Sequence, residues 1–419
     1  MTLIKTSLLN GLAVVIKMLT LLGINKVLAI YVGPAGYAAV GQFQNAVQMI
    51  TTFASGAINT GVTKYTAEYH QDEAKQRLVW GTAGSIVLFG SLMTSIIIAI
   101  FNKPLASWFL KSEDYGGVFL WFSGALVLFT LNTLLIAILN GKKEINRYVL
   151  ANISGSILAL IITTILAVYF KLYGALIALA LYQSVSFFAT LTFCYKTSWF
   201  RIEHLFGKID KEIALNLSKF AAMALTSVIC VPLSQIILRE HIGENFGWQS
   251  AGYLEAMWRL SGAYLMLITT TLSVYYLPRL SEIRNSIEIR SEIIQGYKVI
   301  LPSVIIGVVF IYLLRDYLIL LLFTSEFLPM RDLFAWQLIG DILKIGSWIL
   351  AYLMLSKAMS SSYITLEIIF SLSYLALSWL FTRELGLSGV VIAYTVNYLF
   401  YWIFVAIAVR KLLFDGVRI

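Results

Sequence analysis

Apolar runs of about 20 residues follow one another along the whole chain and are separated by short polar loops. A run of this length crosses the hydrocarbon core of a bilayer, about 30 Å thick, as an α-helix. Only 13% of the 419 residues are charged and 59% are hydrophobic, a composition far from that of a soluble domain. The pattern therefore predicts an all-α integral membrane protein with no soluble domain.

We expect twelve membrane-spanning helices, with boundaries good to about 3 residues. Their ranges are 8–32, 36–62, 79–101, 117–140, 148–170, 173–195, 218–238, 251–277, 298–321, 333–356, 362–381 and 387–409. The first run is too long for the core of a signal peptide and lacks a small-residue cleavage site, so we expect it to be retained. Lys and Arg residues concentrate in the termini and the even-numbered loops, which predicts that both termini are cytoplasmic.

The formal net charge of +9 does not indicate a nucleic-acid partner, because the basic residues are spread over loops without a clustered run. Cys194 and Cys230 lie in or beside predicted spans and are expected to be packing residues. There is no nucleotide-binding Gly-rich loop and no metal-ligand cluster in the sequence. We therefore expect no cofactor and no enzymatic activity.

The two halves of the sequence match at an offset of about 215 residues. The string AGY occurs at 35–37 and again at 251–253. Other matched pairs are Ser112 with Ser325, Phe119 with Phe334, Trp121 with Trp336, Lys142 with Lys357, and Gly174 with Gly389. This predicts a duplicated six-helix unit, with lobes at 1–205 and 206–419. Because six is even, the repeats are parallel, which favours a transporter with its site between the halves and alternating access.

Three cations are predicted near the middle of the membrane. Counting helical rise from the expected helix ends places Lys17 about 13 Å, Arg259 about 12 Å and Lys344 about 16 Å deep. A charge there costs roughly 2.5 to 3.5 kcal/mol. Glu255 and Asp341 lie at i,i+4 and i,i+3 spacing from Arg259 and Lys344 and can neutralise them. Lys17 has no acid within helical reach, so we expect it to face a water-filled cavity or an anionic ligand.

Several alternatives remain open for these charges. The paired charges can simply hold helices together, or Glu255 and Asp341 can carry a coupling proton or ion. Lys26 can guide a headgroup or extend to the membrane surface, and it lies opposite Lys17 unless Gly23 bends the helix.

Specific strings give a family resemblance over the whole chain. They are MRDLFAWQLIGDILKIGSW at 330–348, GVTKYTAEYH at 61–70, KMLTLLGINKVLAIYVGPAGY at 17–37, SVYYLPRLS at 273–281 and LLRDY at 313–317. With these strings the chain resembles the Wzx-type flippases of bacterial surface polysaccharide synthesis, most closely those for enterobacterial common antigen.

The resemblance implies a member of the multidrug/oligosaccharidyl-lipid/polysaccharide exporter superfamily, with two six-helix lobes in a V around a cationic cavity. Such proteins move undecaprenyl-pyrophosphate-linked oligosaccharides across the bacterial inner membrane, from the cytoplasmic to the periplasmic leaflet, and other polysaccharide-assembly proteins are expected partners. The positions that match the family's pyrophosphate-binding pattern are Lys17, Lys26, Arg315, Asp341 and Lys344.

One position departs from the common-antigen pattern. Gly262 precedes Ala263-Tyr264-Leu265, where that pattern has an acidic residue, so the glycan can equally be an O-antigen unit. A small-molecule or multidrug exporter of the same superfamily is the alternative function, although it would favour an acidic cavity. A polymerase or acyltransferase would require a large periplasmic loop, and the longest such region here, about 102–116, is short.

Overall fold

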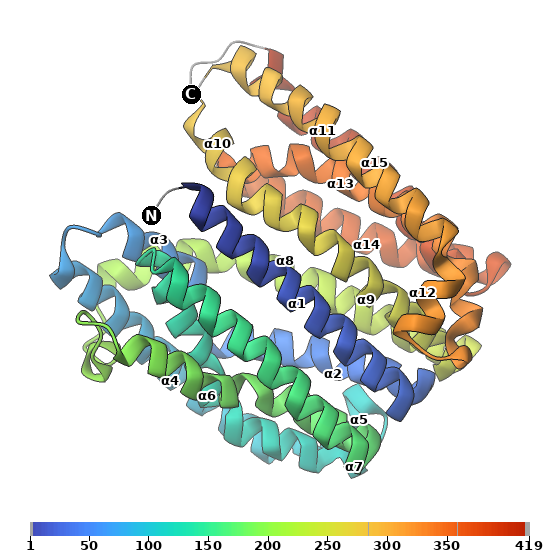
Figure 1. Ribbon diagram of the computed structural model, residues 1–419, viewed down its shortest axis with the longest axis horizontal. Helices are drawn as coiled ribbons and strands as arrows, with labels where there is room; N and C mark the ends of the chain where they lie inside the picture. Colours follow the sequence, from blue (N-terminus) through green and yellow to red (C-terminus); the bar gives the residue numbers. More distant parts are fainter. Residues whose placement is uncertain (1–2, 284, 358, 415–419) are drawn as a thin grey trace. The chain divides into compact units, whose positions relative to one another are not determined.

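The computed structural model describes residues 3–283, 285–357 and 359–414, and in these ranges every regular element is a helix (Figure 1). No strand occurs in the part of the chain so described. A backbone inside hydrocarbon has no water to bond with, and a helix satisfies its own N–H and C=O groups. The predicted all-α membrane architecture is confirmed.

The elements of the first half of the chain are α1 Leu3–Tyr31, α2 Gly33–Ala54, α3 Asn59–Glu68, α4 Glu73–Ile100, α5 Asn102–Leu110, the short 3-10 helix η1 Glu113–Tyr115, α6 Gly116–Gly141 and α7 Ile145–Tyr195. A 3-10 turn, η2 Ile202–Leu205, lies between the halves. The second half contains α8 Lys211–Phe246, α9 Trp248–Thr271, the π-helix η3 Leu272–Tyr276, α10 Leu277–Glu282, α11 Ser286–Leu313, α12 Arg315–Leu322, the 3-10 helix η4 Ser325–Leu333, α13 Phe334–Ser356, α14 Ser360–Leu385 and α15 Ser388–Phe414.

Nine helices among the described residues are long and apolar enough to cross a membrane, so the chain is a multi-pass membrane protein. The longest, α7, has 51 residues and would be about 77 Å long if straight, which exceeds one crossing. It breaks at Lys171, where φ is 50° and ψ is −128°, and therefore supplies two spans. Helices α2 and α9 are 22 and 24 residues long but carry more polar residues. With these additions, each of the twelve expected ranges overlaps a long helix. The bounds differ most for 36–62, which runs past the end of α2 at Ala54, and for 298–321, which runs past the end of α11 at Leu313.

The order of elements repeats between the halves. A short helix, a 3-10 helix and a long buried helix occur as α5, η1 and α6, and again as α12, η4 and α13. The two legs of α7 correspond to α14 and α15. Positive-φ glycines separate the first two long helices of each half, at Gly33 (φ 69°) and Gly247 (φ 86°). The repeated strings in the sequence thus correspond to a repeated series of helices.

The turn between the last two helices of each half has the same local geometry. The break falls at Lys171 (φ 50°) in one half and at Gly386 (φ 58°) in the other, a separation of about 215 residues. Three residues later, a Cβ added to Gly174 would lie 1.9 Å from the carbonyl oxygen of Leu166, and one added to Gly389 would lie 2.5 Å from the carbonyl carbon of Phe381. Both glycines are needed because one helix crosses the end of the other at backbone contact.

Lys142 and Lys357 also have similar roles in the two halves. Lys142 follows α6, and its Nζ donates to Oε1 of Gln76 at the start of α4, with an N···O distance of 3.0 Å. Lys357 follows α13, and its Nζ donates to the carbonyl oxygen of Ile283, just before α11. A cation at the C-terminal end of a helix is favoured by the helix dipole. In each half this lysine therefore ties the end of one span to the start of another.

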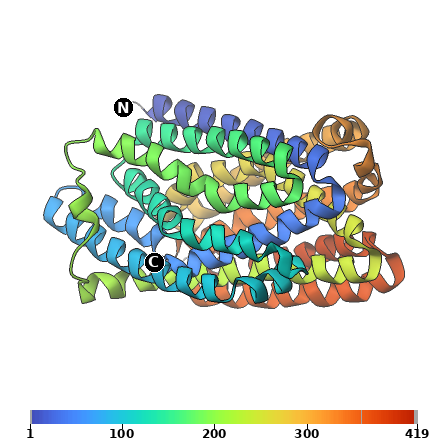
Figure 2. The ribbon, with the colours of Figure 1, turned by 90° about the horizontal axis from the view of Figure 1, so that it is seen from below.

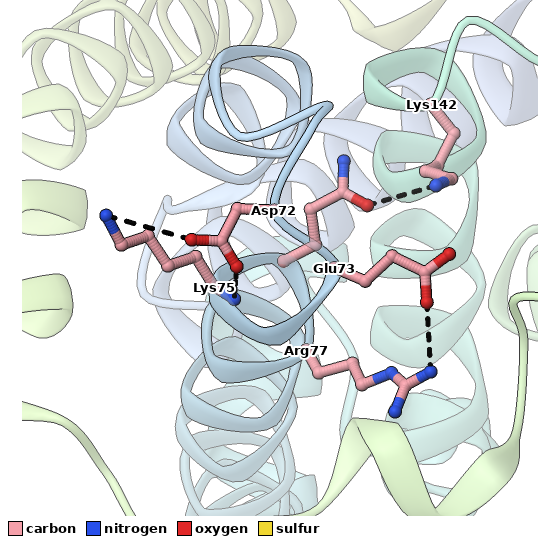
Figure 3. Close-up of polar contacts among 6 residues, drawn as sticks. Asp72, Glu73, Lys75, Arg77 and Lys142 are labelled. Atoms are coloured by element: carbon pink, nitrogen blue, oxygen red, sulfur yellow. Dashed lines mark hydrogen bonds and ion pairs between the residues drawn. The ribbon is translucent and has the colours of Figure 1, made fainter.

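Figure 3 shows the charged turn before α4, where Lys142 approaches. Asp72 caps α4 by accepting from the backbone N–H of Lys75 at 3.0 Å. Lys75 Nζ lies 3.8 Å from Asp72 Oδ2, and Arg77 Nη2 lies 3.1 Å from Glu73 Oε2 (Figure 3). These four side chains are about half exposed, so their pairs form a solvated face, and such pairs contribute about 0 to 1 kcal/mol each.

The described contacts divide the chain into two compact units. Unit 1 contains residues 1–32 and 39–232, and unit 2 contains residues 33–38 and 233–419. The division falls inside α8 and α2, so these units are not the same objects as the six-helix lobes predicted at 1–205 and 206–419. Those lobe boundaries stay a prediction about the duplication.

In unit 1, α1 lies beside α7, as Figure 2 shows at the top of the view. Gly23 permits this contact, because a Cβ added there would lie 3.2 Å from Cδ1 of Leu160. The helix continues through Gly23 from Leu3 to Tyr31, so this glycine serves helix packing.

The tight turn before α15 generates a stability prediction. Gly389→Ala places a methyl group against the backbone of Phe381, and overpacking of this kind costs about 1 to 3 kcal/mol. We expect a lower melting temperature of the purified protein in detergent. Gly307→Ala is the matched control, because nothing lies within 4 Å of an added Cβ at that position. Equal melting temperatures for the two variants would contradict the close approach.

Candidate functional site

Lys17 and Lys26 belong to unit 1, and both project from α1. The Lys17 side chain is exposed, and its ammonium makes no ion pair with the described residues. The Lys26 side chain is half-buried. Lys17 is therefore the more exposed of the two cations, and its role toward a ligand stays a prediction.

Glu255 lies between two arginines in unit 2. Its Oε1 is 2.7 Å from Nε of Arg259, four residues along α9, and its Oε2 is 3.0 Å from Nε of Arg239 on α8. The Arg259 guanidinium lies 5.2 Å from the ring centre of Tyr37, and that of Arg239 lies 5.6 Å from the ring centre of Trp258. The expected Glu255–Arg259 pair is confirmed, and a second arginine shares the same carboxylate.

Asp341 is fully buried on α13 and accepts from four neutral donors. Ser261 Oγ donates at 2.6 Å, Tyr394 Oη at 2.8 Å and Gln337 Nε2 at 3.2 Å, and the Tyr264 hydroxyl is the fourth donor. Hydrogen bonds to a charged acceptor are stronger than those between neutral groups, so this arrangement compensates the lost hydration of a carboxylate without a cation in contact.

Lys344 is not paired with Asp341 as the i,i+3 spacing predicts. In the part of the chain that the structure describes, no carboxylate oxygen lies within 4.0 Å of its Nζ. Its ammonium instead lies 4.9 Å from the ring centre of Trp348, 5.4 Å from that of Tyr398 and 5.7 Å from that of Tyr394. Aromatic faces attract cations without neutralising them. Lys344 is thus a half-buried cation held by rings, with its charge available to an anion.

The two acidic clusters are joined by α9. From Glu255 to Tyr264 this helix rises about 14 Å and contributes residues to both clusters. Glycines on α13 bring α15 close enough for the Tyr394 hydroxyl to reach Asp341: a Cβ added at Gly340 would lie 2.4 Å from the Tyr394 ring, and one at Gly346 would lie 2.5 Å from Trp402. We call these two clusters, with Lys344, the polar core of unit 2.

Arg315 lies apart from this polar core, at the first residue of α12. Its Nη1 donates to the carbonyl oxygen of Tyr312 at 2.9 Å, and its guanidinium lies 4.1 Å from the ring centre of the same residue. Its neighbour Asp316 pairs with Arg331 at 3.6 Å, and both side chains of that pair are about half exposed. These contacts fit anchoring of a loop end.

The sequence analysis did not find the donors to Asp341 or the second arginine at Glu255, and Arg239 and Tyr394 illustrate why. Arg239 was placed just beyond a span expected to end at residue 238, but α8 continues to Phe246 and buries it completely. Tyr394 was one of many aromatic residues in its segment. A longer estimate of the seventh span would have placed Arg239 within hydrocarbon, where an arginine requires a partner.

The described residues contain no group of three or more His, Cys, Asp or Glu side chains that could hold a metal ion. Cys194 is buried and Cys230 half-buried, and neither forms a disulfide bond. The site therefore consists of arginine, lysine, carboxylate and aromatic groups, which can bind a charged or sugar-bearing molecule.

Comparison with known proteins identifies the family. Residues 3–284 match the family described as polysaccharide biosynthesis protein. The chain is 31% identical over 409 residues to the lipid III flippase of Escherichia coli (strain K12). The match covers 96% of this chain and 97% of that protein. The same values apply to the lipid III flippase of Shigella flexneri. The chain belongs to the polysaccharide biosynthesis protein family. The resemblance to lipid-linked oligosaccharide flippases is confirmed, and these relatives are named as transporters, in agreement with the expected absence of enzymatic activity.

Solved structures agree on the fold of this family member. An inward-facing multidrug resistance MATE transporter of the MOP superfamily superposes with a TM-score of 0.78 at 17% identity and covers 94% of this chain and 95% of its own. The lipid II flippase MurJ in an inward closed conformation gives a TM-score of 0.75 at 14% identity and covers 99% and 90%. Since both kinds of transporter share the fold, the fold alone does not name the transported molecule.

The Asp341 cluster generates a prediction about stability. Asp341→Asn replaces one acceptor oxygen by an amino group that faces hydroxyl donors, and each buried donor left without an acceptor costs about 1 to 3 kcal/mol. We expect a clearly lower melting temperature. Asp316→Asn changes an exposed pair and is expected to stay within about 0.5 kcal/mol of the parent protein. If both variants melt alike, Asp341 is not held as described.

Proposed function

We propose that this protein flips undecaprenyl-pyrophosphate-linked oligosaccharide units, of O-antigen or enterobacterial common antigen type, from the cytoplasmic to the periplasmic leaflet of the bacterial inner membrane. Both termini are cytoplasmic in this proposal. The pyrophosphate is bound by basic side chains while the prenyl tail stays in lipid, and alternating access of the two lobes exposes the headgroup to either side. No bond is made or broken.

The observation that carries the proposal is the 31% identity to lipid III flippases over nearly the full length of both chains. The fold likeness is compatible with drug export as well. An exporter of cationic drugs would favour acidic groups at its binding site, whereas the cations Lys17, Arg259 and Lys344 carry the accessible charge here and Asp341 is fully enclosed by donors.

The basic residues have different parts in this mechanism. Lys344 and Arg259 supply charge from the polar core of unit 2, and Lys17 supplies charge from α1. An ammonium backed by aromatic rings can exchange those contacts for phosphate oxygens, because a charge-assisted hydrogen bond to phosphate is stronger than a cation–π contact. Lys26 and Arg315 act nearer the membrane surfaces and guide the headgroup.

The acids support the cations rather than contact the substrate. Asp341 fixes Tyr394, whose ring lies against Lys344, so it positions the ammonium through its neighbour. Glu255 holds Arg259 in the same way. The energy for export can come from the membrane potential or, alternatively, from coupling to a proton or ion through these acids.

Removal of the cavity cations tests the proposed substrate. Lys344→Gln and Lys17→Ala are expected to reduce transport of the lipid-linked glycan about tenfold or more, because each deletes a charged hydrogen bond to phosphate. The readout is accumulation of the lipid-linked precursor in cells, together with protein level and melting temperature. Lys75→Gln, at an exposed surface pair, is the control and should transport normally. Normal transport by both site variants would refute the cationic site.

The membrane potential provides a separate prediction. A headgroup with a charge of about −2 gains roughly 2.3 kcal/mol per charge per 100 mV, about 5 kcal/mol in all, when it moves toward a positive periplasm. In proteoliposomes with an imposed potential and no pH gradient, flipping should accelerate when the receiving side is positive. A rate that ignores the potential and follows a proton or sodium gradient would favour ion coupling instead.

A further inference from the structure

One carboxylate serves two arginines in unit 2, and the two arginines differ in accessibility. The Arg239 side chain is 0% exposed and the Glu255 side chain 7%, whereas the Arg259 side chain is 13% exposed. Each arginine contacts a different oxygen of Glu255 through its Nε atom. Arg259 is therefore the outer member of the cluster, and Arg239 is the inner one.

Each of the two guanidinium groups also lies close to an aromatic ring. Arg259 lies over Tyr37, which is itself packed edge-on against Phe323 and Phe327 with ring centres 5.9 and 5.5 Å apart. Arg239 lies over Trp258. Each arginine therefore has a neutral aromatic contact in addition to its contact with Glu255.

From this geometry we infer that Arg239 is a positioning residue that lets Arg259 exchange Glu255 for a phosphate oxygen of the substrate. The inference rests on the proposed function and deepens it. When the phosphate contacts Arg259, Glu255 keeps its pair with Arg239, so no buried carboxylate loses its counter-ion. Arg239 itself does not contact the substrate.

The physical reason is the high cost of an uncompensated charge at a buried position. Without Arg239, both carboxylate oxygens of Glu255 are available to Arg259, and the two residues form a neutral ion pair. A phosphate would then either displace the carboxylate into a buried site without its cation or bind beside a like charge. Either route weakens binding of the anion.

This reasoning makes a double substitution the decisive test. Arg239→Gln alone should lower the affinity of the purified protein for undecaprenyl pyrophosphate at least tenfold. Arg239→Gln combined with Glu255→Gln removes both buried charges, leaves Arg259 with a neutral acceptor, and should restore the affinity to within about threefold of the parent protein. A purely structural role predicts the opposite order, with the double variant at least as defective as the single one.

Controls separate folding from binding. Arg331→Gln removes one partner of an exposed ion pair and should bind normally. Arg239→Lys keeps the inner charge and should retain most of the affinity. If Arg239→Gln alone does not fold, the double variant still tests the inference. A folded double variant whose affinity is tenfold or more below that of the parent protein overturns it.

The same experiment distinguishes failure of the inference from failure of the proposed function. Undecaprenol, which lacks the pyrophosphate, is the comparison ligand. If the parent protein binds both lipids equally, the proposed pyrophosphate site is wrong. If the parent protein prefers the pyrophosphate and Arg239→Gln binds it equally well, only the role of Arg239 is wrong.

Discussion

The absence of water in the hydrocarbon core is the constraint on which the rest of this structure depends. Every backbone amide there must bond within the protein, which restricts the spans to helices. The same requirement acts on side chains. Asp341 gathers donors from α9, α13 and α15, and Glu255 gathers arginines from α8 and α9. The carboxylates of the polar core of unit 2 are thus compensated by their neighbours, and Arg259 and Lys344 are the cations that we propose to bind the substrate.

The duplication allows the polar core to be compared with the equivalent helices of the first half, which lack these charged residues. The repeat offset pairs Asp341 with Leu126 and Lys344 with Phe129, and the offset of the AGY strings pairs Arg259 with Phe43. All three first-half residues are buried. Phe43 packs edge-on against Phe119 and Phe122, with ring centres 5.3 and 6.1 Å apart. Equivalent positions are therefore filled by apolar packing in one half and by charge in the other.

Proteins that share this fold transport different molecules. A MATE transporter and a lipid II flippase share the architecture at 17% and 14% identity to this chain. Helix lengths and turn geometry follow from the bilayer and from backbone contacts such as that of Gly389 with Phe381, and these hardly depend on the transported molecule. In our proposal, specificity depends on a small number of charged side chains, which can change while the helices stay the same.

The sequence by itself determined the membrane class, the twelve spans, the repeat and the Glu255–Arg259 pair, because each depends on local spacing along a helix of known rise. Only the tertiary structure decided that Asp341 is held by Ser261 and Tyr394, which are 80 and 53 residues away, and that Lys344 consequently faces aromatic rings. It also decided that Arg239 is buried against Glu255. Spacing along one helix predicts which residues of that helix can reach each other. Donors from other helices can bind the same carboxylate, and which of them do so depends on how the helices pack.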